Sequence, residues 1–86
     1  MTARQREVIR QLCLEPGRKL VPRDGRGLTI TTESGEQAPG TRGVSYTVQA
    51  SLLAAGLIRE AGSGYGRAFV PTDRARDLLT AKARLL

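Results

Sequence analysis

Histidine and tryptophan are absent from this sequence, and cysteine occurs once, as Cys13. Histidine is the side chain that most often acts as general base or metal ligand near neutral pH, so the commonest catalytic and metal sites are excluded. A single cysteine forms no internal disulfide and completes no zinc site of the usual kind. Cys13 lies within an apolar helical pattern, and we interpret it as a small core residue in a protein of a reducing compartment.

Catalytic motifs are lacking as well. The carboxylates, eight in number, are scattered singly, mostly beside arginines, and suggest no acid–base pair. No phosphate-cradling loop of the G-x-x-x-x-G-K-[ST] type occurs. The run G-S-G-Y-G at 62–66 precedes a strand pattern, whereas a dinucleotide loop precedes a helix. We therefore expect no enzymatic activity, no cofactor and no metal ion.

Aromatic residues make up 3% of the chain, so Leu, Ile, Val, Ala and the single phenylalanine, Phe69, must form the core. A chain of 86 residues is expected to fold as one domain, residues 1–86, with a thin core. Such a core leaves little room for a pocket, and we expect no small-molecule ligand. No apolar run reaches the length of about 18 residues that a membrane span needs, and no signal-peptide pattern opens the chain. These features predict a cytoplasmic protein without a membrane partner.

Positive charge is abundant. The chain has 14 basic residues, of which 12 are arginine, and a net charge of +6. The planar fork of arginine suits phosphate groups and guanine edges, so the balance favours a polyanionic partner. The alternative is that the charge serves only solubility.

Two elements are expected in the N-terminal half. Thr2 and Gln5 form a capping box ahead of a helix over about residues 3–14, which Pro16-Gly17 ends. Residues 19–22 and 27–32 read as the strands of a hairpin. Pro22 cannot donate to a strand ladder, which puts its strand at a sheet edge or ends the strand there.

The segment 33–43 is rich in turn formers and is expected to be a loop. A short helix follows, with Ser45 as its N-cap and Gly56 as its left-handed C-terminal residue. Its inward stripe is expected to consist of Val44, Val48, Leu52 and Ala55.

A second hairpin is expected over residues 57–70, with strands at 57–60 and 67–70 around a glycine-rich tip. Thr72 then caps a last helix, whose apolar stripe comprises Ala75, Leu78, Leu79, Ala83 and Leu86. The predicted fold class is α+β, in the order helix, hairpin, loop, helix, hairpin, helix.

Three segments resemble the winged helix-turn-helix domains of bacterial or phage regulators. T-A-R-Q-R-E-V-I-R resembles the first helix of SOS-response repressors. S-Y-T-V-Q-A-S-L-L-A-A-G-L-I-R resembles a recognition helix with the first wing strand, and G-R-A-F-V-P-T-D-R-A-R-D-L-L resembles the second wing strand with the following helix. The chain departs from the family because a hairpin, and not a helix, is expected before the recognition helix. The last segment also lacks the glycine usual in its T-x-x-G-R pattern.

The resemblance implies a sequence-specific protein for double-stranded DNA, a small transcription regulator such as a repressor, associated with the nucleoid. The helix at about 45–55 would enter the major groove, and the wing at 57–70 would contact the backbone or minor groove. A homodimer joined through the C-terminal helix, 73–86, would read two half-sites. The expected DNA-binding residues are Thr41, Arg42, Ser45, Tyr46, Thr47, Gln49, Ala50, Arg59, Ser63, Tyr65 and Arg67.

The helix at 45–55 carries no charge from Val44 to Ile58, whereas a solvated face usually carries Lys and Glu. Such a face suits either a DNA groove or another protein. The alternative function is therefore a winged-helix adaptor that binds a protein through Ala50, Leu53 and Ala54.

Overall fold

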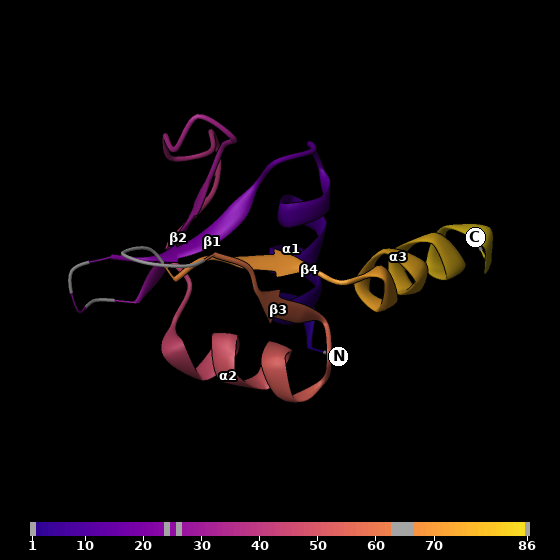
Figure 1. The fold of residues 1–86 in the computed structure, drawn as a ribbon. Coiled ribbons are helices and arrows are strands. Elements are labelled where there is room, and N and C mark those ends of the chain that lie inside the picture. The colour runs from indigo at the N-terminus through magenta and orange to yellow at the C-terminus, as the bar shows by residue number, and fades with distance from the viewer. Residues whose placement is uncertain (1, 24, 26, 63–66, 86) are drawn as a thin grey trace.

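Helices alternate with pairs of strands along the chain in the computed structural model, which describes residues 2–23, 25, 27–62 and 67–85, with side chains through residue 80. The elements, in order, are α1 (Ala3–Cys13), β1 (Lys19–Pro22), β2 (Leu28–Thr31), α2 (Tyr46–Ala54), β3 (Ile58–Glu60), β4 (Phe69–Pro71) and α3 (Asp73–Leu85) (Figure 1). This is an α+β arrangement of three helices and four antiparallel strands within the described residues.

The two hairpins join into one sheet with the strand order β2-β1-β4-β3. Leu20 of β1 pairs with Ile30 on one side and with Phe69 of β4 on the other. β1 is therefore an interior strand, and the suggestion that Pro22 marks a sheet edge was wrong. The alternative holds, because β1 ends at Pro22, where proline has no N–H to continue the ladder.

The core lies between this sheet and the first two helices. Val8, Ile9 and Leu12 of α1 are fully buried together with Leu52 of α2. They belong to one cluster with the inward residues of the strands, Leu20, Leu28, Ile30, Ile58 and Phe69. Each large aliphatic side chain buried in this way contributes about 1.5–3 kcal/mol to folding, so a few such residues dominate the stability of a small domain.

The ends of α1 follow from the sequence. Thr2 Oγ1 accepts from the backbone N–H of Gln5 at 3.1 Å, and Gln5 Oε1 accepts from the N–H of Thr2 at 2.7 Å. The capping box is thus confirmed, and the helix ends within one residue of the expected position, with Leu14 as its C-cap.

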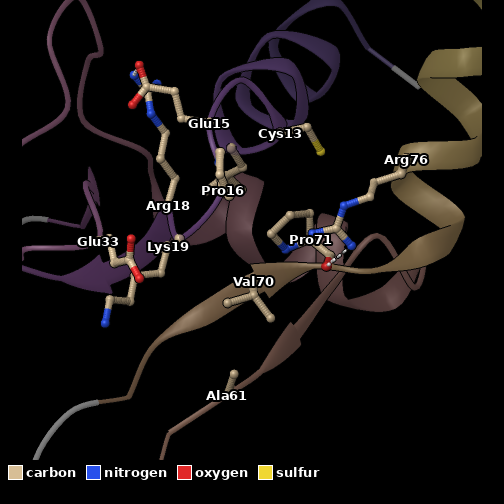
Figure 2. A pocket seen from close by; sticks show the side chains of 12 residues that line it. Cys13, Glu15, Pro16, Arg18, Lys19, Glu33, Ala61, Val70, Pro71 and Arg76 are labelled. Carbon is tan, nitrogen blue, oxygen red and sulfur yellow. Dashed lines mark hydrogen bonds and ion pairs between the residues drawn. The ribbon is translucent and has the colours of Figure 1, made fainter.

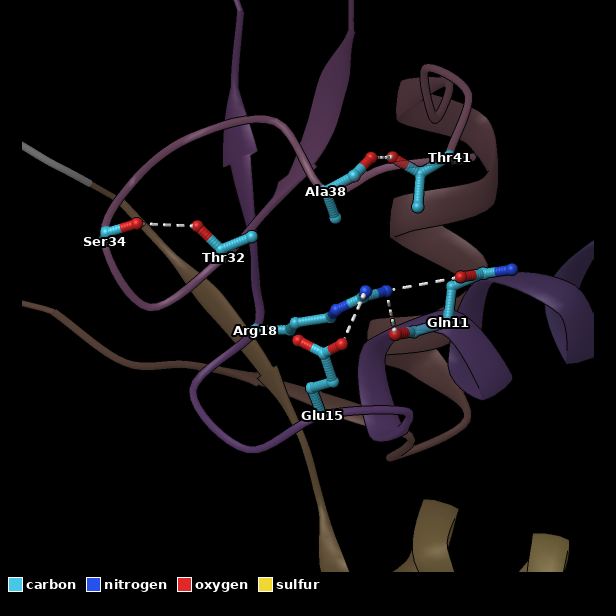
Figure 3. A network of polar contacts seen from close by, with 7 residues as sticks. All are labelled: Gln11, Glu15, Arg18, Thr32, Ser34, Ala38 and Thr41. Carbon is cyan, nitrogen blue, oxygen red and sulfur yellow. Dashed lines mark hydrogen bonds and ion pairs between the residues drawn. The ribbon is translucent and has the colours of Figure 1, made fainter.

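A buried arginine, which the sequence did not single out, closes the C-terminal end of α1. Arg18 is only 5% exposed, and its Nη1 donates to the carbonyl oxygen of Gln11 at 3.1 Å and to Gln11 Oε1 at 3.3 Å (Figure 3). Its Nη2 lies 3.6 Å from Glu15 Oε1. The cation therefore satisfies a carbonyl at the negative end of the helix dipole, where positive charge is stabilising.

The capping of α2 is also confirmed. Ser45 Oγ accepts from the N–H of Val48 at 3.2 Å. Gly56 has φ +71°, and the N–H groups of Gly56 and Leu57 donate to the carbonyls of Leu53 and Leu52, which is the Schellman pattern. Glycine is favoured here because a side chain at this φ is strained.

The prediction that Ala55 belongs to the inward stripe of α2 was wrong. Val44 and Leu52 are buried and Val48 is half-buried, but Ala55 is exposed. The helix ends at Ala54, so Ala55 lies beyond its last full turn and the chain then reverses direction. Leu57, which is buried, takes the inward position instead.

The segment before α2 contains no helix between Thr32 and Ser45, all of which the structure describes. It is a loop, as expected, but it is anchored at Ala38. This side chain is 1% exposed, and the Ala38 N–H donates to the carbonyl of Ile30 at 2.9 Å. Thr41 Oγ1 in turn donates to the Ala38 carbonyl at 2.7 Å (Figure 3).

Thr72 joins the end of α2 to the start of α3. Its hydroxyl donates to the carbonyl of Gly56 at 2.6 Å and accepts from the N–H of Ala75 at 3.3 Å, as expected of a helix cap. Ala75 is buried and Leu79 is half-buried, whereas Leu78 is 42% exposed. The predicted contributions of Ala83 and Leu86 lie outside the described side chains. Figure 1 shows α3 projecting from one end of the molecule.

None of the helices in the described part of the chain has the length and apolar character needed to cross a membrane.

Candidate nucleic-acid interface

Both hairpin loops leave the sheet at the same end. β1 and β4 are antiparallel and pair at Leu20 and Phe69. The loop after β1 begins beyond Pro22, and the loop before β4 ends ahead of Phe69. In an antiparallel pair the end of one strand lies beside the start of the other, so the two loops emerge together.

The start of α2 lies at this same end. Pro22 pairs with Leu28, and Leu28 forms a bridge to Val44, with both N–H···O distances 2.7 Å. Ser45 then caps the helix, whose first residue is Tyr46. Three segments that are far apart in the sequence therefore lie at the same end of the sheet: the residues that follow Pro22, those that directly precede Phe69, and the amino-terminal end of α2.

The outer face of α2 is uncharged and consists of small and neutral side chains. Tyr46 is 48% exposed and Leu53 is 38% exposed. Thr47, Ala50 and Ala54 are also exposed, while Gln49 is half-buried. The structure thus places Tyr46, Thr47 and Ala50 of the predicted site on one accessible surface and holds Gln49 at its margin.

This face is held in a fixed orientation by α1. Gln5 Nε2 donates to Ser51 Oγ at 2.7 Å, and the same hydroxyl donates to the carbonyl of Val48 at 2.7 Å. On the inner side of the helix, Leu52 is fully buried. A polar contact and a buried anchor together determine which side of α2 faces outward.

Arg4 and Arg42 lie near the start of α2, and both contact the same carboxylate, that of Glu7. Arg42 Nη2 lies 3.7 Å from Glu7 Oε2, and Arg4 Nη1 lies 3.4 Å from the same oxygen. Arg4 Nη2 also donates to the carbonyl of Gly43 at 2.6 Å. The side chain of Arg42 is 77% exposed, so it remains accessible to a partner in spite of the ion pair.

The remaining predicted residues fall into three groups. Arg59 of β3 and Arg67, which precedes β4, are both exposed. The hydroxyls of Thr41 and Ser45 already have structural partners, the Ala38 carbonyl and the Val48 N–H. Ser63 and Tyr65 lie outside the described residues, as does the rest of the wing tip at 63–66.

Sequence reasoning missed Arg23 and Arg4 as members of this surface. Arg23 is exposed just after β1, and it lines a hollow of about 240 Å³ together with Gly27, Leu28 and Gly43. Arg4 reaches the start of α2 across 39 positions of sequence. The concentration of arginine around Asp24-Gly25 was a usable signal for Arg23. The position of Arg4 in the first turn of α1, where a cation opposes the helix dipole, was a local hint of a partner, but it did not indicate the contact with Gly43.

A larger cavity of about 520 Å³ lies beside the C-terminal end of α1 and the junction of β4 with α3 (Figure 2). Its walls include Cys13, Arg18 and Arg76. The sequence led us to expect little room for a pocket, so a cavity of this volume was not expected. Arg18 is engaged by Gln11 and Glu15, and Arg76 lies 3.5 Å from Asp73 Oδ1. The Nε atom of Arg18 is buried without a partner among the described residues, but the terminal nitrogens of both cations have protein partners, and we assign no ligand to the cavity.

Cys13 is one of the residues that line this cavity (Figure 2). Partial burial raises the pKa of Cys13 above its ordinary value of 9.0, and the positive charge of Arg76 opposes this to a lesser extent. The thiol is therefore protonated near neutral pH and is a poor nucleophile there.

Within the part of the chain that the structure describes, no three His, Cys, Asp or Glu side chains come together to hold a metal ion.

The sequence matches no protein-family model, and comparison with curated proteins and with solved structures gives no similar protein.

Proposed function

We propose that this protein binds double-stranded DNA in a sequence-specific manner and acts as a small transcription regulator at the nucleoid. The observation that carries the proposal is the uncharged outer face of α2, which begins where both hairpin loops leave the sheet and where Arg4 and Arg42 gather. The proposed fold is a winged-helix variant in which the hairpin β1–β2 occupies the place of the usual helix before the recognition helix.

In this proposal α2 enters the major groove. Gln49 pairs with an adenine edge, and Ala50 or the methyl group of Thr47 contacts a thymine methyl. The hydroxyl of Tyr46 donates a hydrogen bond to a phosphate oxygen. Small neutral side chains suit this role, because they let the helix approach the base edges without burying a charge that lacks a partner.

The surrounding arginines supply most of the affinity. Arg42 precedes the amino-terminal end of α2, where backbone N–H groups and the helix dipole also favour a phosphate. Arg67 and Arg59 flank the second hairpin and contact the backbone or the minor groove. The overall charge of +6 adds a long-range attraction to the DNA.

The proposal includes a homodimer formed through α3. This helix follows β4 and projects from one end of the molecule (Figure 1), and Leu78 on it is exposed. A twofold dimer would present two copies of α2 to two half-sites. Analytical ultracentrifugation of the wild type and of Leu78→Asp tests this part, since the variant is expected to shift toward monomer.

Selection of bound duplexes from a random pool is the direct test of the function. We expect a recurrent sequence, and binding to it that weakens by at least about tenfold between about 50 and about 200 mM salt, because arginine–phosphate contacts release counterions. A pool that stays random after selection, or an affinity that hardly changes with salt, would contradict the proposal.

The exposure of Leu53 and Tyr46 favours a second candidate function, a winged-helix adaptor that binds another protein through the same face of α2. An exposed leucine and tyrosine suit a protein contact, where aromatic and aliphatic anchors concentrate. A gel-shift assay with mixed genomic DNA at low salt separates the candidates. Retardation supports DNA binding, and free migration at micromolar protein supports the adaptor.

A further inference from the structure

We propose that the hairpin β1–β2 forms a second DNA-backbone contact, with Arg23 as its phosphate-binding side chain. This inference rests on the proposed DNA-binding function. It extends that function to a hairpin in which the sequence predicted no DNA-binding residue. Arg23 lies immediately after β1, at the base of the first hairpin loop.

The position of this hairpin relative to α2 is set by direct backbone contacts. Leu28 and Val44 exchange two hydrogen bonds of 2.7 Å. Gly27 packs so closely on the same segment that a Cβ at this position would lie 2.6 Å from the Val44 carbonyl oxygen. The hairpin and the start of α2 therefore form one unit.

Arg23 is tied to that unit through its own backbone. Its N–H donates to the carbonyl of Gly27 at 2.8 Å, which closes the base of the loop. Arg23 and Gly43 also line the same hollow of about 240 Å³, so Arg23 lies close to the residue that follows Arg42. The backbone of Arg23 is thus held beside the start of α2.

The charge environment of Arg23 differs from that of Arg42. Arg42 shares the Glu7 carboxylate with Arg4. Among the described side chains, no carboxylate oxygen lies within 4.0 Å of a nitrogen of the exposed Arg23. A cation with this exposure gains more from a phosphate than one that must first leave an ion pair.

The sheet sets the spacing between the two hairpins. In the order β2-β1-β4-β3, the midlines of the hairpins are two strand spacings apart, or about 10 Å at the usual spacing of about 4.8 Å. The major groove is about 12 Å wide. Val44 bridges to Leu28 on the side of β2 away from β1, so the first hairpin lies between the start of α2 and the second hairpin. With α2 in that groove, the loop of the first hairpin is the nearer of the two to backbone phosphates beside the start of the helix.

The test compares Arg23→Ala with Arg10→Ala in salt titrations on a duplex that the wild type binds. Arg10 is an exposed arginine in the last turn of α1, so it is a matched control for loss of one surface charge. We expect Arg23→Ala to bind every sequence roughly three- to tenfold more weakly, with a salt slope reduced by about one. Arg23→Lys should retain most of the slope, and Arg10→Ala should change neither quantity to this extent.

Phosphate-ethylation interference gives a second readout that a structural role would not move. Interference at one backbone position should disappear in Arg23→Ala while the remaining pattern is unchanged. If the wild type binds DNA and Arg23→Ala matches Arg10→Ala in slope and interference pattern, this inference is overturned and the proposed function stands. If the wild type fails to bind any duplex, the proposed function fails and takes this inference with it.

Discussion

The guanidinium of Arg42 lies 3.7 Å from the carboxylate of Glu7, and this pair joins α1 to the segment just before α2. The same carboxylate lies 3.4 Å from Arg4, whose other nitrogen donates to the Gly43 carbonyl. A negative charge is thus built into the surface at which we propose that DNA binds. It orients two arginines in the free protein and opposes the approach of phosphate.

We predict that Glu7→Gln binds DNA roughly three- to tenfold more tightly, on all sequences alike. The neutral amide removes a repulsion and leaves both arginines to the phosphates. Because the pairs are partly exposed, the free energy of unfolding should change by less than about 1 kcal/mol. Fluorescence anisotropy on a labelled duplex measures the affinity. Glu36→Gln, an exposed site in the loop before α2, is the control for a gain of one charge unit.

Gln49→Ala is expected to change specificity more than affinity. If Gln49 pairs with an adenine edge, its loss should remove about 1–3 kcal/mol of discrimination at one base position. Arg67→Ala should instead weaken all sequences by a similar factor, since phosphate contacts carry no sequence information. Parallel selections from a random pool with the two variants measure this difference. A Gln49→Ala variant with an unchanged selected sequence would show that Gln49 reads no base.

The pKa of Cys13 predicts how its reactivity depends on pH. Burial raises this pKa above 9.0, so the folded protein holds the thiol proton more tightly than the unfolded chain. Alkylation by iodoacetamide should therefore be slow at pH 7 and should rise only above about pH 9. A rate that levels off below pH 8 would contradict the assignment, and the same protein in denaturant gives the reference rate.

The same shift has a consequence for stability. A group whose pKa is raised on folding contributes stability that is complete below the unfolded pKa and is lost as pH rises through the folded pKa. For Cys13 that loss begins near pH 9. The difference in unfolding free energy between the wild type and Cys13→Ala should accordingly shrink above pH 9, which denaturant titrations at several pH values can measure.

The local parts of the fold were predictable because their signals are short-range. Thr2 with Gln5, Ser45, and Gly56 with Leu57 each satisfy helix-end groups within a few residues, and each cap is present as expected. The joining of the hairpins was not predictable in the same way. The pairing of Leu20 with Phe69 connects residues 49 positions apart, and no local pattern specifies it.

The candidate interface was likewise predictable only in its local features. The uncharged face of α2 could be read from the sequence, because charge and helical spacing are local properties. The proximity of Arg4 and Glu7 to Arg42, and that of Arg23 to Gly43, depends on how α1 and the first hairpin pack. Arg18 was overlooked for a related reason: buried arginines are rare, and its partner Gln11 becomes apparent only once the chain has turned at Gly17.

Gly27→Ala tests whether the first hairpin aims α2. At φ +119° a side chain is strained, and a Cβ would lie 2.6 Å from the carbonyl oxygen of Val44, so the backbone on one side must move. Gly25→Ala is the matched control in the same loop, because its φ is +72° and a Cβ added there would have no atom within 4 Å. We expect Gly25→Ala to cost about 1 kcal/mol and Gly27→Ala clearly more, measured by denaturant unfolding. DNA affinity should follow the same order if the Leu28–Val44 contact positions α2. Equal losses of stability for the two variants would show that the close approach of Gly27 to Val44 is not required. Equal losses of DNA affinity would show that this approach does not position α2.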